Sequence, residues 1–156
     1  LAKAFISFKE IADKKKEITN DDLEALVKDQ VMGIPERFTL TYLHISSGTS
    51  IVPTATVKLT IDDMSFEAAA TGDGPVDAAC LAVDKLTDLY GKMHEYKLHA
   101  VSGGKDALGE VISRIEINGK QYNGRGLSTD IIEASVKSYI NAINKYYFEQ
   151  KNHTDN

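Results

Sequence analysis

A chain of 156 residues that is 42% hydrophobic and 26% charged has the size and composition of one globular domain, with room for a small appendage. Its net charge of -5 argues against a broad basic surface, so neither nucleic acid nor a membrane is an expected partner. The single cysteine, Cys80, excludes a disulfide within the chain and a multi-cysteine zinc site, and it fits the reducing cytoplasm, which is the expected location.

The first 33 residues indicate a small helical subdomain that ends in a linker. Apolar side chains along residues 4–17 share one helical face, and no apolar stretch of a signal peptide precedes them. Thr19 predicts the start of a second short helix, because its hydroxyl can accept an unpaired backbone N–H. Gly and Pro within residues 31–35 interrupt both periodicities and indicate the linker. Because the chain begins at Leu1 rather than Met, we expect a fragment of a longer protein.

From Phe38 the hydrophobic period changes to two, which is typical of half-buried strands. The period predicts strands at 38–46, 54–61 and 64–70, and then a helix from Val76 to Leu86. Asp62-Asp63 forms a turn between the second and third strands, and the glycine-rich segment 71–75 leads into the helix. Cys80 falls on the apolar face of this helix, so we expect it in the core.

The same order of elements returns in the second half of the chain. The patterns predict strands at 96–100, 107–117 and 120–125, and a helix opened by residues 126–130 with Ile132, Val136, Tyr139 and Ile143 on one face. Asn118-Gly119 marks a hairpin, because both residues tolerate positive φ. We therefore predict an α+β fold with two pseudo-symmetric βββα units, at about 38–90 and 94–148. They form one domain over 34–150, between the helical subdomain at 1–33 and a frayed polar tail at 151–156.

Known catalytic constellations do not occur in the sequence. The four histidines, at positions 44, 94, 99 and 153, lack metal-ligand spacing, and no nucleophile-elbow or phosphate-loop motif occurs. Cys80 has no neighbouring base in the sequence that could activate it. We therefore expect no metal, no cofactor and no enzyme activity within this chain.

The two strand-to-helix turns, Gly72–Pro75 and Gly126–Thr129, are the candidate binding features. The first N–H groups of a helix have no intrahelical partner and lie at the positive end of its dipole, so they can hold a carboxylate. Pro75 suits the first helical position. Two such helix starts facing each other would form an anion-binding pocket. Plain helix capping is the alternative, and it is the commoner role for Gly, Ser, Thr and Asp.

Three segments carry a family resemblance: GDGPVDAA, YKLHAVSGGKDALGEV and GRGLSTDIIEASVKSYINAIN. Together they resemble the C-terminal allosteric domain of 2-isopropylmalate synthases and of the related citramalate synthases. The N-terminal stretch FKEIADKKKEITNDDLEALV resembles the helical subdomain that joins the catalytic barrel of that family to this domain. The resemblance implies a homodimer that binds L-leucine near the dimer interface. It also implies that the intact enzyme condenses acetyl-CoA with 2-oxoisovalerate on a (β/α)8 barrel, which is absent here together with its divalent metal.

The resemblance also implies the residues of the leucine site. They are Asp73, Gly74, Pro75, Val76 and Asp77 at the first helix start, Met93, Tyr96, Ala100 and Ala107 around the ligand side chain, and Leu127 and Ser128 at the second turn. Small residues at Ala100 and Ala107 leave room for a γ-branched side chain, which favours leucine over isoleucine. An isoleucine-sensing domain of a citramalate synthase and a purely structural dimerisation module remain as alternatives. A free-standing enzyme is a third, and the missing motifs argue against it.

Overall fold

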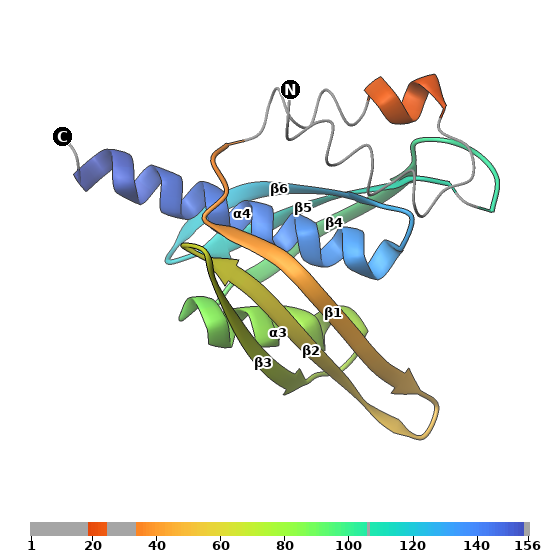
Figure 1. The fold of residues 1–156 in the computed structure, drawn as a ribbon, viewed down its shortest axis with the longest axis horizontal. Helices are drawn as coiled ribbons and strands as arrows, with labels where there is room; N and C mark the ends of the chain where they lie inside the picture. The colour runs from red at the N-terminus through yellow and green to blue at the C-terminus, as the bar shows by residue number, and fades with distance from the viewer. Residues whose placement is uncertain (1–18, 25–33, 106, 155–156) are drawn as a thin grey trace.

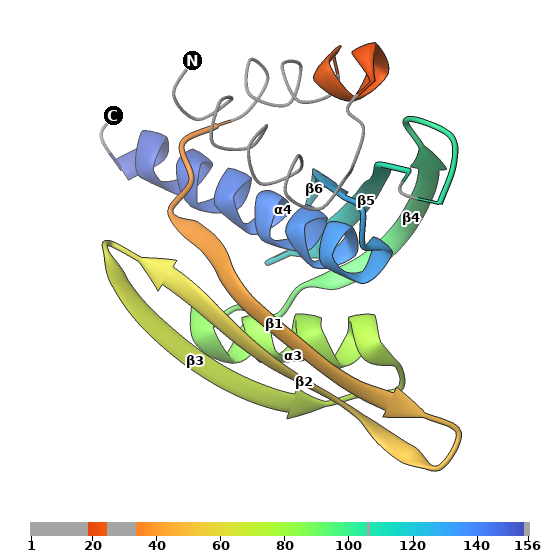
Figure 2. The same ribbon diagram turned by 45° about the vertical axis from the view of Figure 1, so that its right-hand side comes forward.

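A computed structural model of the chain describes residues 19–24, 34–105 and 107–154, and the helix predicted at 4–17 lies outside these ranges. The described part contains two three-stranded antiparallel sheets, each followed by one helix (Figures 1 and 2). The first unit comprises β1 (Phe38–Gly48), β2 (Ile51–Ile61), β3 (Met64–Thr71) and α3 (Pro75–Thr87). The second comprises β4 (Lys92–Ala100), β5 (Gly109–Ile117), β6 (Lys120–Ser128) and α4 (Ile131–Thr154). The predicted α+β fold of two βββα units is confirmed.

The first sheet buries one face against α3. β2 lies in its centre, and the alternation of β2 turns Ala55, Val57 and Leu59 toward the helix, where all three are fully buried. On the helix, the small residues Ala78 and Ala82 meet these side chains in the same core. Half-buried threonines and Lys58 occupy the other face of β2, as predicted from the period of two.

The second unit packs more closely because two glycines of β6 face α4. A Cβ at Gly124 would lie 1.9 Å from the backbone oxygen of Ser138, and one at Gly126 would lie 2.0 Å from that of Ala134. Only residues without a side chain allow this approach. α4 packs mainly on β5 and β6, so Tyr96 on the outlying strand β4 stays 41% exposed.

The two units share one hydrophobic core, and their helices run side by side with both N-termini at the same end (Figures 1 and 2). The side-chain amide of Asn144 on α4 fixes the start of β1. It accepts hydrogen bonds from the backbone N–H groups of Arg37 and Phe38, and it donates one to the carbonyl of Phe38. Within the ranges described, no helix has the length and apolar character needed to cross a membrane.

Two predicted boundaries of α4 are wrong. β6 continues through Gly126 to Ser128, because these residues pair with β5 instead of opening the helix. Asp130 is the capping residue, since its carboxylate accepts the N–H groups of Ile132 and Glu133. At the other end, α4 continues to Thr154, beyond the predicted end near Glu149.

The helix start predicted at Thr19 is confirmed, and residues 20–24 are helical. The Thr19 hydroxyl accepts the N–H of Asp22 at 3.1 Å, and the Asp22 carboxylate accepts the N–H of Thr19 at 3.1 Å. This reciprocal pair is a capping box with Asp in place of the usual Glu. Asp22 is fully buried.

Candidate functional site

The start of α3 is shaped by Gly72 and Asp77. A Cβ on Gly72 would lie 2.5 Å from the backbone nitrogen of Ala78, so only glycine lets the end of β3 pass under the first helical turn. The Asp77 carboxylate accepts the N–H of Asp73 at 2.9 Å and closes the turn. Gly74 is the N-cap residue, and no side chain caps the helix there.

This start of α3 leaves backbone donors available. The first intrahelical hydrogen bond runs from the N–H of Ala78 to the carbonyl of Gly74, so the amides of Val76 and Asp77 precede it. Pro75 has no N–H to offer. A Cβ at Gly74 would meet nothing within 4 Å, and Val76 is only half-buried. The two amides lie at the positive end of the helix dipole, which favours a carboxylate as their acceptor.

The second helix start differs from the first, because it lacks the free amides expected there. Asp130 already occupies the first amides of α4 with its own carboxylate. Ser128 is fully buried, and its hydroxyl donates to Glu133 at 2.6 Å and accepts the N–H of Asp130 at 3.1 Å. Ser128 therefore fixes the strand-to-helix connection and offers no free hydroxyl.

Three of the predicted site residues do lie together, near the start of α4. Ala100 pairs with Gly109 on β5, and Gly109 pairs with Ser128 on β6. Ala100 and Ser128 therefore lie in one row across the sheet, with Gly109 between them. Tyr96 lies on the same face of β4 as Ala100, and its hydroxyl is 2.7 Å from the Ser135 hydroxyl on α4. Ala107 precedes β5 and is half-buried.

Other predicted residues are kept apart within the chain. Met93 is seven residues before Ala100 on β4, roughly 23 Å away at the usual strand rise, and it packs against the shared core. Leu127 is buried and points to the opposite face of β6 from Ser128. No hydrogen bond among the described residues joins 73–77 to Tyr96 or Ala100.

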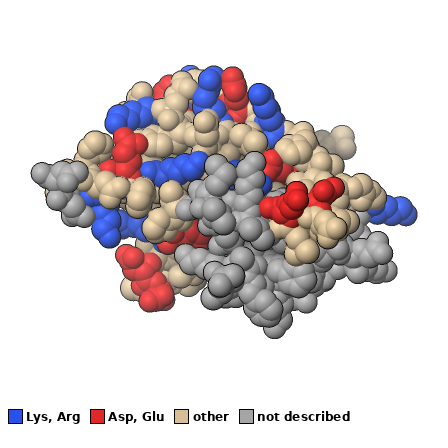
Figure 3. All heavy atoms as spheres, turned by 90° about the horizontal axis from the view of Figure 1, so that it is seen from above, with Lys and Arg blue, Asp and Glu red and all other residues tan. Residues whose placement is uncertain are grey.

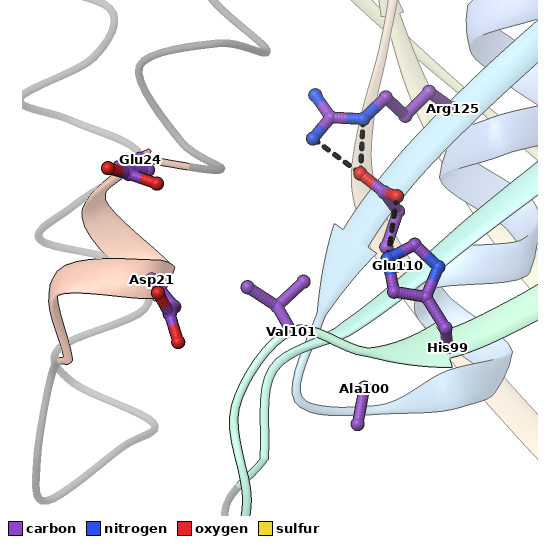
Figure 4. Close-up of a pocket in the computed structure, with 7 residues that line it drawn as sticks. All are labelled: Asp21, Glu24, His99, Ala100, Val101, Glu110 and Arg125. Carbon is purple, nitrogen blue, oxygen red and sulfur yellow. Dashed lines mark hydrogen bonds and ion pairs between the residues drawn. The ribbon is translucent and has the colours of Figure 1, made fainter.

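A separate hollow of about 320 Å³ lies on the opposite face of the second sheet (Figure 4). It is lined by Asp21, Glu24, His99, Ala100, Val101, Glu110 and Arg125. Only Ala100, at the end of β4, was also predicted as a site residue. Glu110 is 7% exposed, an unusual environment for a carboxylate, and in the sequence it is only one of two glutamates in the alternating segment that forms β5.

Two titratable groups of α3 are shifted by burial. Burial, followed by the charges of Asp84 and Asp77, raises the pKa of the Cys80 thiol, so the thiol stays protonated. Cys80 packs against the core as predicted. Burial also raises the pKa of Asp84 to about 6, although the hydrogen bond from Tyr139 works against this shift.

On the face shown in Figure 3, the described Lys and Arg side chains are interspersed with Asp and Glu.

The two βββα units make the described part of the chain an α+β domain with an internal repeat. The sequence model of the LeuA allosteric (dimerisation) domain matches residues 17–147, and the chain belongs to this family. The family resemblance predicted from the three sequence segments is thereby confirmed.

Named relatives agree with the family. The chain is 51% identical over 152 residues to a 2-isopropylmalate synthase of Pelotomaculum thermopropionicum, covering 97% of the chain and 30% of that protein. It is 51% identical over 150 residues to one of Carboxydothermus hydrogenoformans, covering 96% of the chain and 30% of that protein. The chain is 50% identical over 149 residues to a 2-isopropylmalate synthase of Heliobacterium modesticaldum, covering 96% of the chain and 29% of that protein. The chain thus corresponds to the dimerisation and regulatory domain of these enzymes and spans about 30% of their length.

Proposed function

We propose that this chain senses L-leucine and imposes feedback inhibition on a 2-isopropylmalate synthase of which it is the regulatory part. The observation that carries the proposal is the uncapped start of α3 in a chain of this family. The amide N–H groups of Val76 and Asp77 would donate hydrogen bonds to the leucine carboxylate. The exposed Asp73 carboxylate would pair with the ammonium group, because Asp77 is already engaged with the Asp73 N–H.

The ligand side chain would lie against Tyr96, Ala100 and Ala107. Within one chain these residues form no hydrogen bond to the start of α3, and Met93 lies at the other end of β4. A second copy, which the dimerisation family leads us to propose, can supply residues that one chain keeps apart. The effector would then bind where two copies meet, and its affinity would depend on dimerisation.

Calorimetric titration with leucine, isoleucine and valine tests the proposal. Saturable binding of leucine, clearly tighter than that of isoleucine, is the expected result. Tighter isoleucine binding would assign the chain to the citramalate branch. Absence of binding by a folded dimer would leave a structural dimerisation module and contradict the sensing function.

In the intact enzyme, acetyl-CoA and 2-oxoisovalerate would react on a catalytic barrel that carries a divalent metal. The described residues gather no group of three or more His, Cys, Asp or Glu side chains that fits such a metal, so no metal chemistry is assigned to them. Leucine can inhibit the barrel only by binding one state of the regulatory domain better than another. The N-terminal segment at residues 4–28 would carry this difference. A full-length enzyme with that segment decoupled should bind leucine and escape inhibition, and intact inhibition would contradict this route.

A further inference from the structure

Strand β4 presents different partners on its two faces. Tyr96 and Ala100, which belong to the proposed effector site, lie on the face shared with α4. His99 immediately precedes Ala100 in the sequence. Its side chain points to the other face of the sheet, because successive side chains of a strand alternate. There its Nε2 lies 3.1 Å from Oε1 of Glu110 (Figure 4). One short stretch of strand therefore contacts both the proposed site and the hollow behind it.

The hollow is built on a cluster that takes one side chain from each strand of the sheet. β4 contributes His99, β5 contributes Glu110 and β6 contributes Arg125. Arg125 donates through Nε and through a terminal nitrogen to Oε2 of Glu110, while His99 faces the other oxygen. A carboxylate this deeply buried needs its partners, because removing one leaves a charge without compensation. The cluster thus links the positions of the three strands on this face.

The helical segment 20–24 forms the opposite wall of the hollow. Asp21 and Glu24 on that segment line the hollow on the side away from the cluster (Figure 4). The positive charge of Arg125 offsets the negative charge of Glu110. The sheet side of the hollow therefore does not repel the carboxylates of Asp21 and Glu24. Without that offset, three carboxylates would face one another, and like charges at short range repel. A cluster that kept a net negative charge would therefore oppose the approach of segment 20–24 to the sheet.

We propose that the His99–Glu110–Arg125 cluster transmits effector binding from β4 to the N-terminal segment. The inference rests on the proposed leucine site and names the contact that regulation passes through. A ligand that shifts β4 on its Ala100 face also moves His99 against Glu110, since adjacent residues of one strand move together. The carboxylate and its Arg125 partner then change the field felt by Asp21 and Glu24. The cluster contacts β4 on one side and lies across the hollow from segment 20–24 on the other, and the coupling requires that it adopt two arrangements that both sites bias.

Hydrogen exchange of the whole chain, measured by mass spectrometry with and without leucine, tests this inference. Leucine should protect peptides covering 93–101 and also the segment 19–24. In a His99→Ala variant, protection of 93–101 should remain and protection of 19–24 should be lost. His94→Ala is the matched control. This variant removes the contact between His94 Nε2 and Glu116 Oε1, which lie 3.1 Å apart at the far end of β4 and β5. Leucine should still protect both 93–101 and 19–24 in it.

The alternative outcomes separate the two proposals. Protection of 93–101 without protection of 19–24 in the unaltered chain would overturn the coupling and leave leucine sensing intact. Retained protection of 19–24 in His99→Ala would also overturn the coupling. No protection anywhere would overturn the sensing function and the coupling with it. As a second variant, Arg125→Gln should speed exchange at 19–24 without any ligand, and unchanged exchange there would contradict the charge balance.

Discussion

The phenolic hydroxyl of Tyr139 on α4 donates a hydrogen bond to the carboxylate of Asp84 on α3 and accepts one from the N–H of Gly91 at 3.0 Å. This contact joins the two βββα units just before β4 begins. A Cβ at Gly91 would lie 2.3 Å from the hydroxyl, so glycine is needed there. Together with the Asn144 amide, this polar contact helps to fix the relative placement of the units.

Replacing Tyr139 by Phe should lower the free energy of unfolding by about 1–3 kcal/mol, because Asp84 and Gly91 lose a partner in a partly buried site. Urea denaturation of both proteins measures the difference. Tyr146→Phe is the control, since that hydroxyl accepts only an exposed hydrogen bond from Asn118, at 2.7 Å. Equal losses in the two variants would show that the Tyr139 contact does not hold the units together.

The Asp84 carboxyl should make the stability of the chain depend on pH. Its pKa is raised from 3.8 to about 6, chiefly by burial, so the folded state binds its proton more tightly than the unfolded state. Stability from this group should therefore fall as pH rises from about 4 to about 6. We expect a loss on the order of 1–2 kcal/mol, discounted because the group keeps contact with water.

Asp84→Asn tests this pH dependence, because Asn cannot ionise and keeps an oxygen acceptor for Tyr139. Denaturation midpoints at several pH values between 4 and 7 should show a smaller decline for the variant than for the unaltered chain. Parallel declines would mean that another group causes the pH dependence.

Gly126→Ala should destabilise the chain by about 3 kcal/mol or more, because the added methyl group would collide with the backbone of α4 at Ala134. Thermal unfolding monitored by circular dichroism measures the effect. Gly103→Ala is the control, since a Cβ at that position meets nothing within 4 Å. Similar stability of the two variants would contradict the close packing of α4 on β6.

Local patterns were sufficient to predict most of the fold. The period of two located β2, although the strand begins at Ile51, before the predicted start at 54. Both predicted hairpin turns carry the positive φ that their residues tolerate, 50° and 65° at Asp62 and Asp63 and 51° at Asn118. The end of β6 could not be predicted, because Gly126 resembles a turn residue in sequence. Gly126 instead allows α4 to pack closely on β6, and this contact forms only in the tertiary structure.

The polar cluster was missed for a related reason. His99, Glu110 and Arg125 lie on three strands and meet only through the register of those strands. No local spacing signals such a meeting. The proposed effector residues came instead from family resemblance, and the structure places Met93 and Leu127 away from the others.

Ala100→Ile should weaken leucine binding by at least about tenfold, because the larger side chain fills the space proposed for the ligand. Calorimetry measures the affinity. Lys97→Ile is the matched control, since it introduces the same side chain on the same strand but on the opposite face. Leucine binding that is unchanged in Ala100→Ile would remove Ala100 from the pocket.

The most direct test of leucine sensing is the amide spectrum of the chain, recorded by nuclear magnetic resonance during a leucine titration. The N–H signals of Val76 and Asp77 should shift saturably and downfield as they donate to the ligand carboxylate. The amides of Ile132 and Glu133, which Asp130 already caps, should move much less. Saturable leucine binding that leaves Val76 and Asp77 unmoved would contradict the assignment of the α3 start as the effector site.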